Sequence, residues 1–276
     1  MSTLKEKKMF MLDMDGTIYN ESTLIPGAME FFHLLQERGV HYTFMTNNSS
    51  KSKFTYVEKL HKLGIDCTEK HIASSVNATV AYLKANKPNA KLYIVGTESL
   101  KYELEVEGFS IVPLDYREPD IDYVLVGFDV ELTYEKLVGA CWYISRDIPF
   151  VATNCDLRCP VLENKFIPDC GAICEMIEVA TERKPLYLGK PDKYIVEAVM
   201  KEWRLKPEDV ATVGDRLYTD IAVGINAGVD SICVLTGEAT IEEIEKSDIS
   251  KKSQISLIVR HIIITINKNQ NANSSD

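Results

Sequence analysis

The sequence predicts an α/β fold in which helices pack on the faces of a parallel sheet. Two observations point to it. The first third of the chain alternates short apolar runs, each ending in polar residues, with segments of helical periodicity. The same alternation returns in the last third, after Lys184. A strand–helix–strand–helix order favours a parallel sheet, because parallel strands need a crossover connection between them.

The first elements are bounded by residues that start or stop helices. Pro26 suits the first position of a helix, and Gly39 and Gly64 each close a helical segment. The expected elements are, in order, a strand over 9–13, a helix over 26–39, a strand over 40–47 and a helix over 50–64.

The later elements follow the same reasoning. Apolar runs that end in polar residues predict strands over 91–96, 121–129, 149–156, 209–215 and 229–237. Helices are expected over 133–147, 190–205 and 217–228, and a short apolar run occupies 186–188.

Composition limits the kind of protein. The chain has 276 residues, enough for one large domain or two modest ones, and 45% hydrophobic with 26% charged residues is ordinary for a soluble globular protein. The formal net charge of -10 argues against a nucleic-acid partner. It permits a phosphorylated substrate, because a few local cations and a metal ion can hold one.

No targeting or membrane segment is expected. The N-terminus shows no secretory signal, and the apolar stretch 255–266 is short and contains Arg260 and His261. We therefore expect a soluble, cytoplasmic protein without a membrane partner. The seven cysteines, an odd number, argue against a disulfide framework. Two CxxxC pairs are present, Cys155 with Cys159 and Cys170 with Cys174. They could have a zinc-binding or redox role, and the alternative is that they simply pack in the core.

Two acids follow the first strand. Asp13 and Asp15 end the apolar run 9–13, and alternate positions of an extended strand face the same way. Two adjacent buried anions are unfavourable unless a metal, a basic partner or a shared proton meets them.

Further polar residues end other predicted strands. Ligands of open α/β sheets bind beyond the carboxyl ends of the strands. Thr46 with Asn47, Asp215 and Lys190 occupy such ends, and Asp220 follows shortly after. Acids that hold a divalent cation, with one lysine and one hydroxyl, suit a phosphoryl group.

These residues also form a recognisable series of motifs. DxDGT at 13–17, Thr-Asn at 46–47, GKP at 189–191 and GDxxxTD at 214–220 resemble, in that order, the four motifs of the haloacid dehalogenase (HAD) superfamily. The interval before Thr46 has room for one helix and one strand, whereas the interval from Thr46 to Lys190 can hold a domain. That spacing resembles the class IIA, NagD-like or 4-nitrophenylphosphatase-type phosphatases.

The resemblance implies a domain organisation. It implies a doubly wound, Rossmann-like parallel-sheet HAD core with an inserted α/β cap domain of the C2 type. We expect the core in residues 1–78 and 185–265, the cap in 79–184 and a disordered tail in 266–276.

The resemblance also implies a chemistry. Asp13 would attack phosphorus and form an aspartyl phosphate, and Asp15 would act as general acid and then base. Mg2+ would be the cofactor, held by the side chains of Asp13 and Asp215 and the carbonyl of Asp15, with Asp220 nearby. The phosphate- and substrate-binding residues implied are Gly16, Thr46, Asn47 and Lys190, with Asn154 and Asp156 from the cap.

The expected partner is a small phosphate ester: a sugar phosphate, a nucleoside monophosphate, pyridoxal phosphate or an aryl phosphate. Two alternatives stay open, a phosphotransferase or phosphomutase of the same superfamily and a non-catalytic module that binds a phosphorylated metabolite. The family includes dimers, so a homodimer also stays open.

Overall fold

The chain forms two compact units in the computed structural model. The structure describes residues 6–161, 165–247 and 257–259. Unit 1 comprises residues 1–46, 56–73 and 191–276, and unit 2 comprises residues 47–55 and 74–190. The predicted tail 266–276 lies outside the described residues, as does most of the apolar stretch 255–266.

Unit 1 is built on a six-stranded sheet in the order β15-β14-β13-β1-β4-β5. β1 pairs in parallel with both β4 and β13, and the pairs β13–β14 and β14–β15 are also parallel. The sheet therefore grows outward from β1 in both directions, as the doubly wound prediction requires. The strands are β1 (Met9–Asp13), β4 (His41–Thr46), β5 (Ile72–Ser74), β13 (Val210–Gly214), β14 (Asp230–Val234) and β15 (Leu257–Val259).

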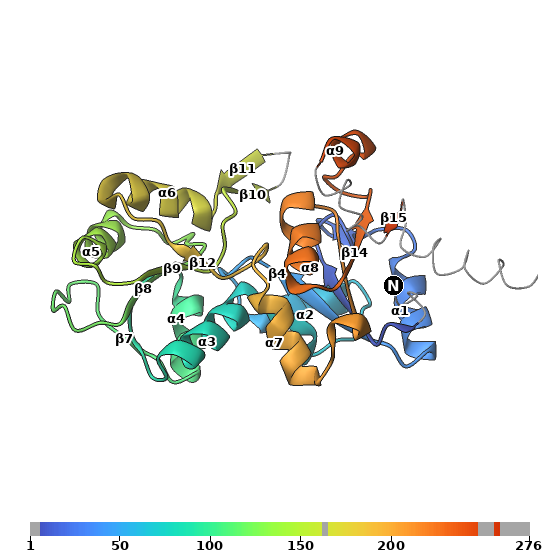
Figure 1. Cartoon of the computed structure of the whole chain (residues 1–276), viewed down its shortest axis with the longest axis horizontal. Coiled ribbons are helices and arrows are strands. Elements are labelled where there is room, and N and C mark those ends of the chain that lie inside the picture. The colour runs from blue at the N-terminus through green and yellow to red at the C-terminus, as the bar shows by residue number, and fades with distance from the viewer. Residues whose placement is uncertain (1–5, 162–164, 248–256, 260–276) are drawn as a thin grey trace, which may run out of the picture. The chain divides into compact units, whose positions relative to one another are not determined.

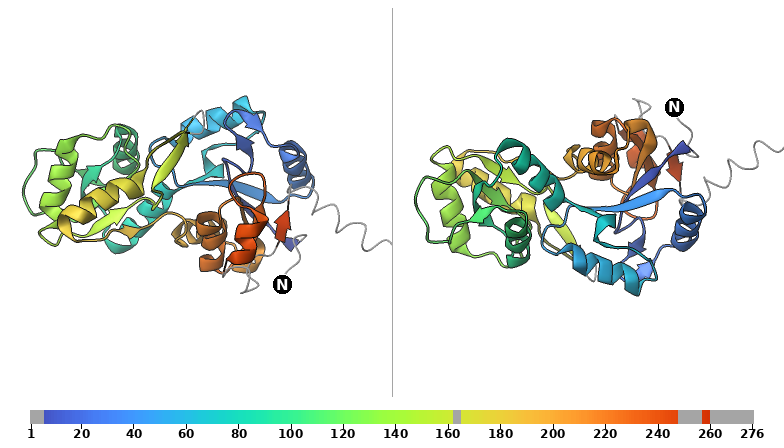
Figure 2. Two further views of the ribbon diagram at one scale, coloured as in Figure 1. Left: turned by 90° about the horizontal axis from the view of Figure 1, so that it is seen from above. Right: turned by 90° about the horizontal axis from the view of Figure 1, so that it is seen from below.

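Helices cover both faces of this sheet. Figure 2 shows α1 and α2 on one side and α7 and α8 on the other. The helix predicted over 217–228 is a π-helical turn, η4 (Leu217–Ile221), followed by α8. The remaining elements are α1 (Ala28–Glu37), α2 (Lys53–Lys62), α7 (Tyr194–Trp203), α8 (Ala222–Ala227), α9 (Ile241–Lys246), the 3-10 turns η2 (Glu69–His71) and η3 (Pro207–Asp209), and the hairpin β2 (Tyr19–Asn20) with β3 (Thr23–Leu24).

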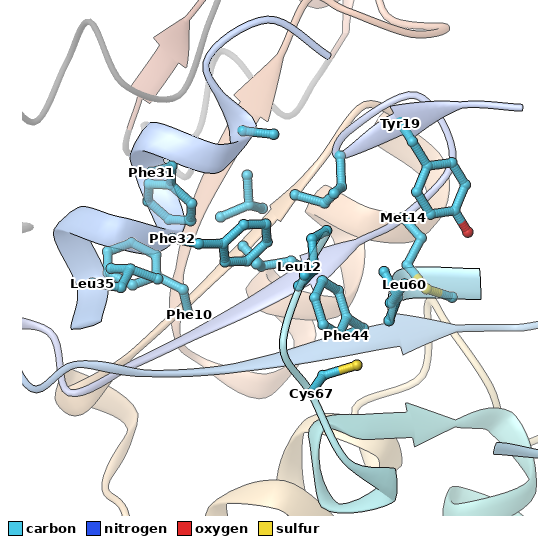
Figure 3. Close-up of a cluster of buried hydrophobic side chains, with 14 of the residues drawn as sticks. Phe10, Leu12, Met14, Tyr19, Phe31, Phe32, Leu35, Phe44, Leu60 and Cys67 are labelled. Carbon is cyan, nitrogen blue, oxygen red and sulfur yellow. The ribbon is translucent and has the colours of Figure 1, made fainter. Parts of the chain in front are cut away.

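An aromatic cluster fills the space between β1, β4 and α1 (Figure 3). The rings of Phe10 and Phe31 meet edge to face, with their centroids 5.6 Å apart. Phe32 contacts Phe44 of the neighbouring strand through tilted rings, with their centroids 5.8 Å apart. Each such side chain contributes about 1.5–3 kcal/mol when fully buried. This packing fixes β1, and with it the acid at its carboxyl end.

Unit 2 is a second α/β layer structure with a sheet in the order β12-β9-β8-β6-β7, in which all four pairs are parallel. Figure 1 shows α3 and α4 on one face and α5 and α6 on the other. β10 and β11 form a separate antiparallel hairpin. The bounds are α3 (Ser75–Asn86), β6 (Lys91–Val95), α4 (Glu98–Val106), β7 (Ser110–Ile111), β8 (Tyr123–Val126), α5 (Tyr134–Ile144), β9 (Phe150–Ala152), β10 (Arg158–Val161), β11 (Lys165–Pro168), α6 (Cys170–Thr181) and β12 (Leu186–Tyr187).

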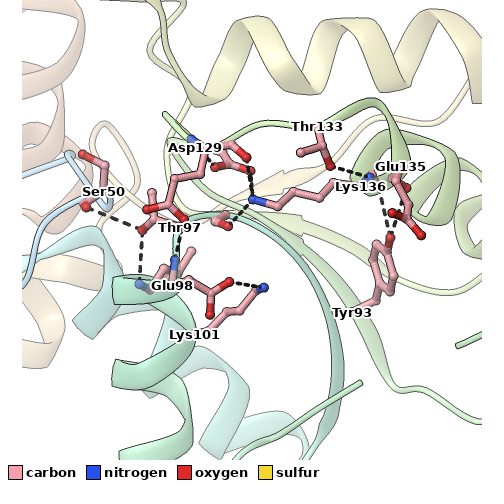
Figure 4. Close-up of polar contacts among 12 residues, drawn as sticks. Ser50, Tyr93, Thr97, Glu98, Lys101, Asp129, Thr133, Glu135 and Lys136 are labelled. Atoms are coloured by element: carbon pink, nitrogen blue, oxygen red, sulfur yellow. Dashed lines mark hydrogen bonds and ion pairs between the residues drawn. The ribbon is translucent and has the colours of Figure 1, made fainter. Parts of the chain in front are cut away.

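A buried ion pair joins α5 to the carboxyl ends of two strands of unit 2 (Figure 4). The Lys136 ammonium lies 2.8 Å from Asp129 Oδ2 and also donates to the carbonyls of Gly96 and Glu131. Because all three ammonium protons have an acceptor, the buried charge is compensated on every side.

The two units have different sequence boundaries from the predicted domains. β12 pairs with β9, so residues 186–187 belong to the sheet of unit 2, whereas the predicted cap ends at 184. The predicted domain bounds stay a prediction. Within the part of the chain that the structure describes, no helix has the length and apolar character needed to cross a bilayer.

The cysteines of the second CxxxC pair belong to the hydrophobic core of unit 2. Cys170 and Cys174 lie on the buried face of α6, and burial raises the pKa of the Cys174 thiol well above its usual range. All seven cysteines lie among the described residues, and none of them forms a disulfide there. Packing in this core is sufficient to explain why small apolar side chains occupy these two positions.

Candidate active site

Three buried carboxylates meet at the carboxyl end of the unit 1 sheet. Asp13 is the last residue of β1, Asp215 directly follows β13, and Asp220 lies in the turn η4. One carboxylate oxygen from each lies within 4.8 Å of the other two. Their exposed fractions are 8%, 2% and 0%. We call these three residues the acid cluster; among the described residues it is the only group of three or more metal-ligating side chains so close together.

Strand pairing explains why the acids converge. β1 and β13 are parallel neighbours with Leu12 opposite Val213, so Asp13 and Asp215 leave the sheet at the same edge. The turn η4 then brings Asp220 back toward Gly214, where a Cβ atom would lie 2.2 Å from the Asp220 Cβ. This edge is the switch point in strand order, the place where open α/β sheets bind ligands.

Fixed donors orient the carboxylates of the acid cluster. The Glu238 amide donates to Asp215 Oδ2 at 2.7 Å, and the Thr17 hydroxyl donates to Oδ1 at 3.4 Å. The Arg216 amide donates to Asp220 Oδ2 at 3.1 Å. Since these donors belong to turns that the backbone holds in place, the carboxylates are organised without a ligand.

Gly16 lets the DxDGT turn approach Asp215. Its φ is +84°, and a Cβ atom built on it would lie 2.5 Å from Asp215 Oδ2. The Thr236 hydroxyl donates to the Gly16 carbonyl at 2.6 Å, which ties this turn to the loop after β14. Only glycine combines this backbone conformation with this contact.

Arg216 directly follows Asp215 in the chain, and its pKa responds to the acid cluster. Burial lowers the pKa of Arg216, but the carboxylates of Asp13, Asp220 and Asp215 outweigh burial and raise that pKa above its usual range. Three carboxylates with oxygen donors only are the ligand set that Mg2+, Mn2+ and Ca2+ prefer. The residues present therefore fit a divalent cation.

Asp15 lies apart from the acid cluster. β1 ends at Asp13, so the alternation of side chains along a strand does not extend to Asp15, whose side chain is 58% exposed. Its carboxylate is 3.8 Å from the Lys59 ammonium, which also lies 3.7 Å above the centroid of the Tyr19 ring. Asp15 thus combines solvent access with a cationic neighbour.

Thr46 lies at the same edge of the sheet as Asp13. It ends β4, and Met45 is the partner of Asp13 in the parallel pair β1–β4. The Thr46 side chain is buried. Strand pairing therefore places Thr46, which carries a hydroxyl, one position beyond Asp13 on the neighbouring strand.

The other predicted site residues form a second group within unit 2. The Asn47 carboxamide accepts from the Lys190 amide at 2.8 Å and donates to the Lys190 carbonyl at 3.0 Å and to Asp156 Oδ2 at 2.9 Å. Asn154 donates to the same Asp156 oxygen at 3.1 Å and to Asp169 Oδ1 at 3.2 Å. Asn47 therefore fixes the main chain of Lys190 and the loop that carries Asp156.

Buried hydroxyls support that loop. The Thr153 hydroxyl donates to Asn154 Oδ1 at 2.9 Å and lies 2.9 Å from the Ser49 hydroxyl, which accepts from the Phe128 amide. Satisfied buried networks of this kind hold a side chain in one conformation. The arrangement stabilises the orientation of Asn154.

Sequence reasoning missed three contributors to the acid cluster: Arg216, Thr17 and Glu238. Arg216 and Thr17 lie within the GDxxxTD and DxDGT motifs, so the sequence already placed them close to the acids of those motifs. Glu238 follows β14, and nothing local in the sequence shows that its amide reaches Asp215.

Comparison with known proteins identifies the family. Residues 10–110 match the family described as haloacid dehalogenase-like hydrolase, and residues 187–262 match the family described as HAD hydrolase-like. The acid sugar phosphatase of Staphylococcus epidermidis is 35% identical over 246 residues, which cover 89% of this chain and 93% of that protein. The chain belongs to the haloacid dehalogenase-like hydrolases.

Solved structures of HAD hydrolases agree with this assignment. The 4-nitrophenylphosphatase of Thermotoga maritima has a TM-score of 0.85 and 36% identity, with 94% of this chain and 95% of that chain covered. NagD from Escherichia coli K-12 has a TM-score of 0.83 and 29% identity, with 92% and 96% covered. The predicted family, the α/β fold and the assignment to the NagD-like HAD phosphatases are confirmed.

Proposed function

We propose that this HAD phosphatase hydrolyses a small phosphate monoester in a reaction that depends on Mg2+ and passes through an aspartyl phosphate on Asp13. The observation that carries the proposal is the acid cluster: three buried carboxylates whose orientation is fixed by amide and hydroxyl donors. Bound Mg2+ would be held by Asp13, Asp215 and Asp220 with the Asp15 carbonyl, and would neutralise negative charge on the phosphoryl oxygens.

Asp13 and Asp15 divide the chemistry. An Asp13 carboxylate oxygen attacks phosphorus while the bond from phosphorus to the ester oxygen breaks, and Asp15 gives its proton to the departing oxygen. A water molecule then attacks the phosphorus of the aspartyl phosphate, and Asp15 accepts the proton that this water loses. The bond between phosphorus and the Asp13 oxygen breaks, which releases inorganic phosphate and restores the Asp13 carboxylate. The exposure of Asp15 supports this role, because an acid that must exchange a proton with solvent needs access to it.

Four further residues would bind the phosphoryl oxygens: Gly16, Thr46, Asn47 and Lys190. The Thr46 hydroxyl and the Lys190 ammonium supply a donor and a positive charge. For Asn47, the hydrogen bonds of its carboxamide favour an indirect contribution, in which it holds Lys190 in place. Asn154 and Asp156 would contact the leaving group from the loop that Asn47 anchors.

We propose sugar phosphates as the first substrate class to test. The curated relatives are named acid sugar phosphatases, while the similar structures are named for an aryl phosphate or for NagD. Nucleoside monophosphates and pyridoxal phosphate complete the panel.

The decisive experiment is hydrolysis of 4-nitrophenyl phosphate by wild type and by Asp13→Asn, each with Mg2+ and with a chelator. We expect turnover only for wild type with Mg2+. Asp209→Asn is the matched control, since Asp209 precedes β13 at the opposite end from Asp215, and it should keep full activity. In Asp15→Asn, rapid acid quenching followed by mass spectrometry should detect a phosphate adduct on Asp13.

Some results of this experiment would contradict the proposed function. Metal-independent turnover, or an adduct on another residue, would contradict the proposed mechanism. If wild type turns over neither 4-nitrophenyl phosphate nor any member of the panel but binds phosphorylated metabolites, the chain is a binding module instead.

A further inference from the structure

The carboxamide of Asn47 connects the main chain of Lys190 to the side chain of Asp156. Its Oδ1 accepts from the Lys190 amide at 2.8 Å, and its Nδ2 donates to the Lys190 carbonyl at 3.0 Å and to Asp156 Oδ2 at 2.9 Å. Both protons of the NH2 group therefore have an acceptor. Asn47, Asp156 and Lys190 all belong to unit 2, so these contacts lie within one compact unit.

Asp156 determines which way round the Asn47 carboxamide lies. A carboxylate oxygen only accepts hydrogen bonds, so it can face the NH2 group of Asn47 but not its carbonyl oxygen. If the carboxamide turned over, its oxygen would lie against both Asp156 Oδ2 and the Lys190 carbonyl, and its NH2 group would face the Lys190 amide. All three hydrogen bonds would then be lost. The negative charge of Asp156 also strengthens the bond that it accepts.

Asp156 is itself held by a second carboxamide. Asn154 donates to the same Asp156 oxygen at 3.1 Å and to Asp169 Oδ1 at 3.2 Å, and its own oxygen accepts from the Thr153 hydroxyl at 2.9 Å. Because Asn154 and Thr153 are fully buried, bulk water does not compete for these bonds. Asp156 therefore has a fixed position from which it can orient Asn47.

The position of the Lys190 ammonium depends on this arrangement. Lys190 is only 3% exposed, so its packed side chain has little freedom to compensate for a shift of its main chain. The preceding Gly189 lies so close that a Cβ atom there would be 2.7 Å from Asn47 Oδ1 and 2.5 Å from the Thr153 carbonyl oxygen. A change in the orientation of the Asn47 carboxamide would therefore displace the main chain at Lys190.

We propose that Asp156 is a positioning residue for phosphate binding: it orients the Asn47 carboxamide, which holds the main chain of Lys190 where its ammonium binds the phosphoryl group. This role rests on the proposed function, in which Lys190 supplies the positive charge. Asp156 then contributes to the binding of every substrate, in addition to the contact with the leaving group proposed above. The two roles can be separated, because the positioning of Lys190 does not depend on the leaving group.

The test is inhibition by inorganic phosphate, which carries no leaving group. It is measured as inhibition of 4-nitrophenyl phosphate hydrolysis by the full chain with Mg2+. We expect Asp156→Ala to raise the inhibition constant of phosphate about tenfold, as for the loss of one charge-assisted hydrogen bond. The same variant should lower kcat/KM by at least about tenfold for every substrate that wild type hydrolyses.

Asp156→Asn isolates the accepting oxygen from the charge. Asn47 and Asn154 both donate to the one oxygen Asp156 Oδ2, and an asparagine at this position can place its own oxygen there. This variant should therefore raise the inhibition constant of phosphate by no more than about threefold. If Asp156→Ala unfolds below the assay temperature, Asp156→Leu, which fills the space without an acceptor, replaces it.

A double-mutant cycle with Asn47 tests the path from Asp156 to Lys190. If Asp156 acts through Asn47, Asp156→Ala should raise the inhibition constant no further in an Asn47→Ala background. Asp115→Ala is the control for the lost charge. Asp115 is exposed and follows β7, at the opposite edge of the unit 2 sheet from β12, so its inhibition constant and kcat/KM should equal those of wild type.

Three results would overturn the inference. If Asp156→Ala leaves the inhibition constant of phosphate unchanged, Asp156 does not position Lys190. If Asp156→Asn is impaired as much as Asp156→Ala, the accepting oxygen does not matter, and if the effects of Asp156→Ala and Asn47→Ala add, Asp156 does not act through Asn47. In these cases wild type still hydrolyses its substrates with Mg2+, and the proposed function stands. If wild type hydrolyses none of them, the proposed function fails and the inference fails with it.

Discussion

At the scale of single residues, the acid cluster shows how a chain tolerates three buried carboxylates. Isolated, each would be strongly unfavourable in the interior. Here Asp215 accepts from an amide and a hydroxyl, and Asp220 accepts from the Arg216 amide. The donors come from turns at strand ends, where backbone N–H groups have no partner in the sheet. The site is thus assembled from groups that the fold leaves available.

Gly16 offers a prediction at this scale. Gly16→Ala should destabilise the protein by at least about 3 kcal/mol, because it adds backbone strain at φ +84° to a collision 2.5 Å from Asp215 Oδ2. It should also weaken Mg2+ binding by at least about tenfold, since the collision displaces a ligand. Chemical denaturation and calorimetry measure the two effects.

Gly39→Ala is the control that isolates strain from collision. Gly39 has φ +64°, and a Cβ atom there meets nothing within 4 Å. It should cost only about 1–2 kcal/mol and leave Mg2+ affinity unchanged. Equal effects of the two substitutions on metal binding would contradict the role assigned to Gly16.

The acids could be predicted from the sequence, whereas the groups that hold them could not. Asp13 and Asp215 each end an apolar run, and that local pattern is sufficient to place them at strand ends. Arg216 and Glu238 meet because β13 and β14 are neighbours, a relation that only the folded sheet establishes. Asp15 was expected beside Asp13 from strand alternation, and the strand ends before alternation reaches it.

At the scale of elements, unit 2 depends on a contact between one helix and two strand ends. Lys136 in the first turn of α5 bonds to the Gly96 carbonyl after β6 and to Asp129 after β8 (Figure 4). Because the pair is buried, removal of one partner leaves an uncompensated charge in the interior. The contact fixes where α5 begins relative to the sheet.

Lys136→Met should therefore destabilise unit 2 by about 3–5 kcal/mol. Trp142 lies in the same helix, so its fluorescence during urea unfolding in a Trp203→Phe background reports the loss. Lys101→Met is the control: Lys101 bonds to Glu98, which is 75% exposed, and the expected cost is within about 1 kcal/mol. Similar losses in both variants would show that burial of the Lys136 pair does not matter.

The strands were easier to predict than the turns between them. The apolar runs of β1, β4, β8 and β13 are bounded by polar residues, and each is a strand in the structure. The π-helical turn η4 was predicted as plain helix, because residue spacing alone does not distinguish the two. The hairpins β2–β3 and β10–β11 have strands of two to four residues, too short to show a period.

At the scale of the whole molecule, every carboxylate of the acid cluster belongs to unit 1. Mg2+ should therefore stabilise unit 1 directly, by mass action on its folded state. The two tryptophans allow this to be observed, since Trp203 lies in unit 1 and Trp142 in unit 2. In Trp142→Phe, Mg2+ at roughly a hundredfold its dissociation constant should raise the free energy of unfolding of unit 1 by about 2.7 kcal/mol.

The companion variant Trp203→Phe reports unit 2, where thermal unfolding followed by Trp142 fluorescence should shift less. An equal shift of both probes would contradict independent stabilisation and would show that the units unfold as one cooperative block.

The position of β1 between β4 and β13 affects how the nascent chain folds during translation. β1 and β4 leave the ribosome early, but β13 and β14 are made only after all of unit 2. Unit 2 (residues 47–55 and 74–190) can close its own sheet while β1 still has one unpaired edge, formed by the apolar run Met9–Leu12. Open apolar edges recruit other chains. If synthesis stalls before Val210, unit 2 can be folded while one edge of β1 remains unpaired and prone to aggregation. We therefore expect the protein to depend most on chaperones during the last third of its translation.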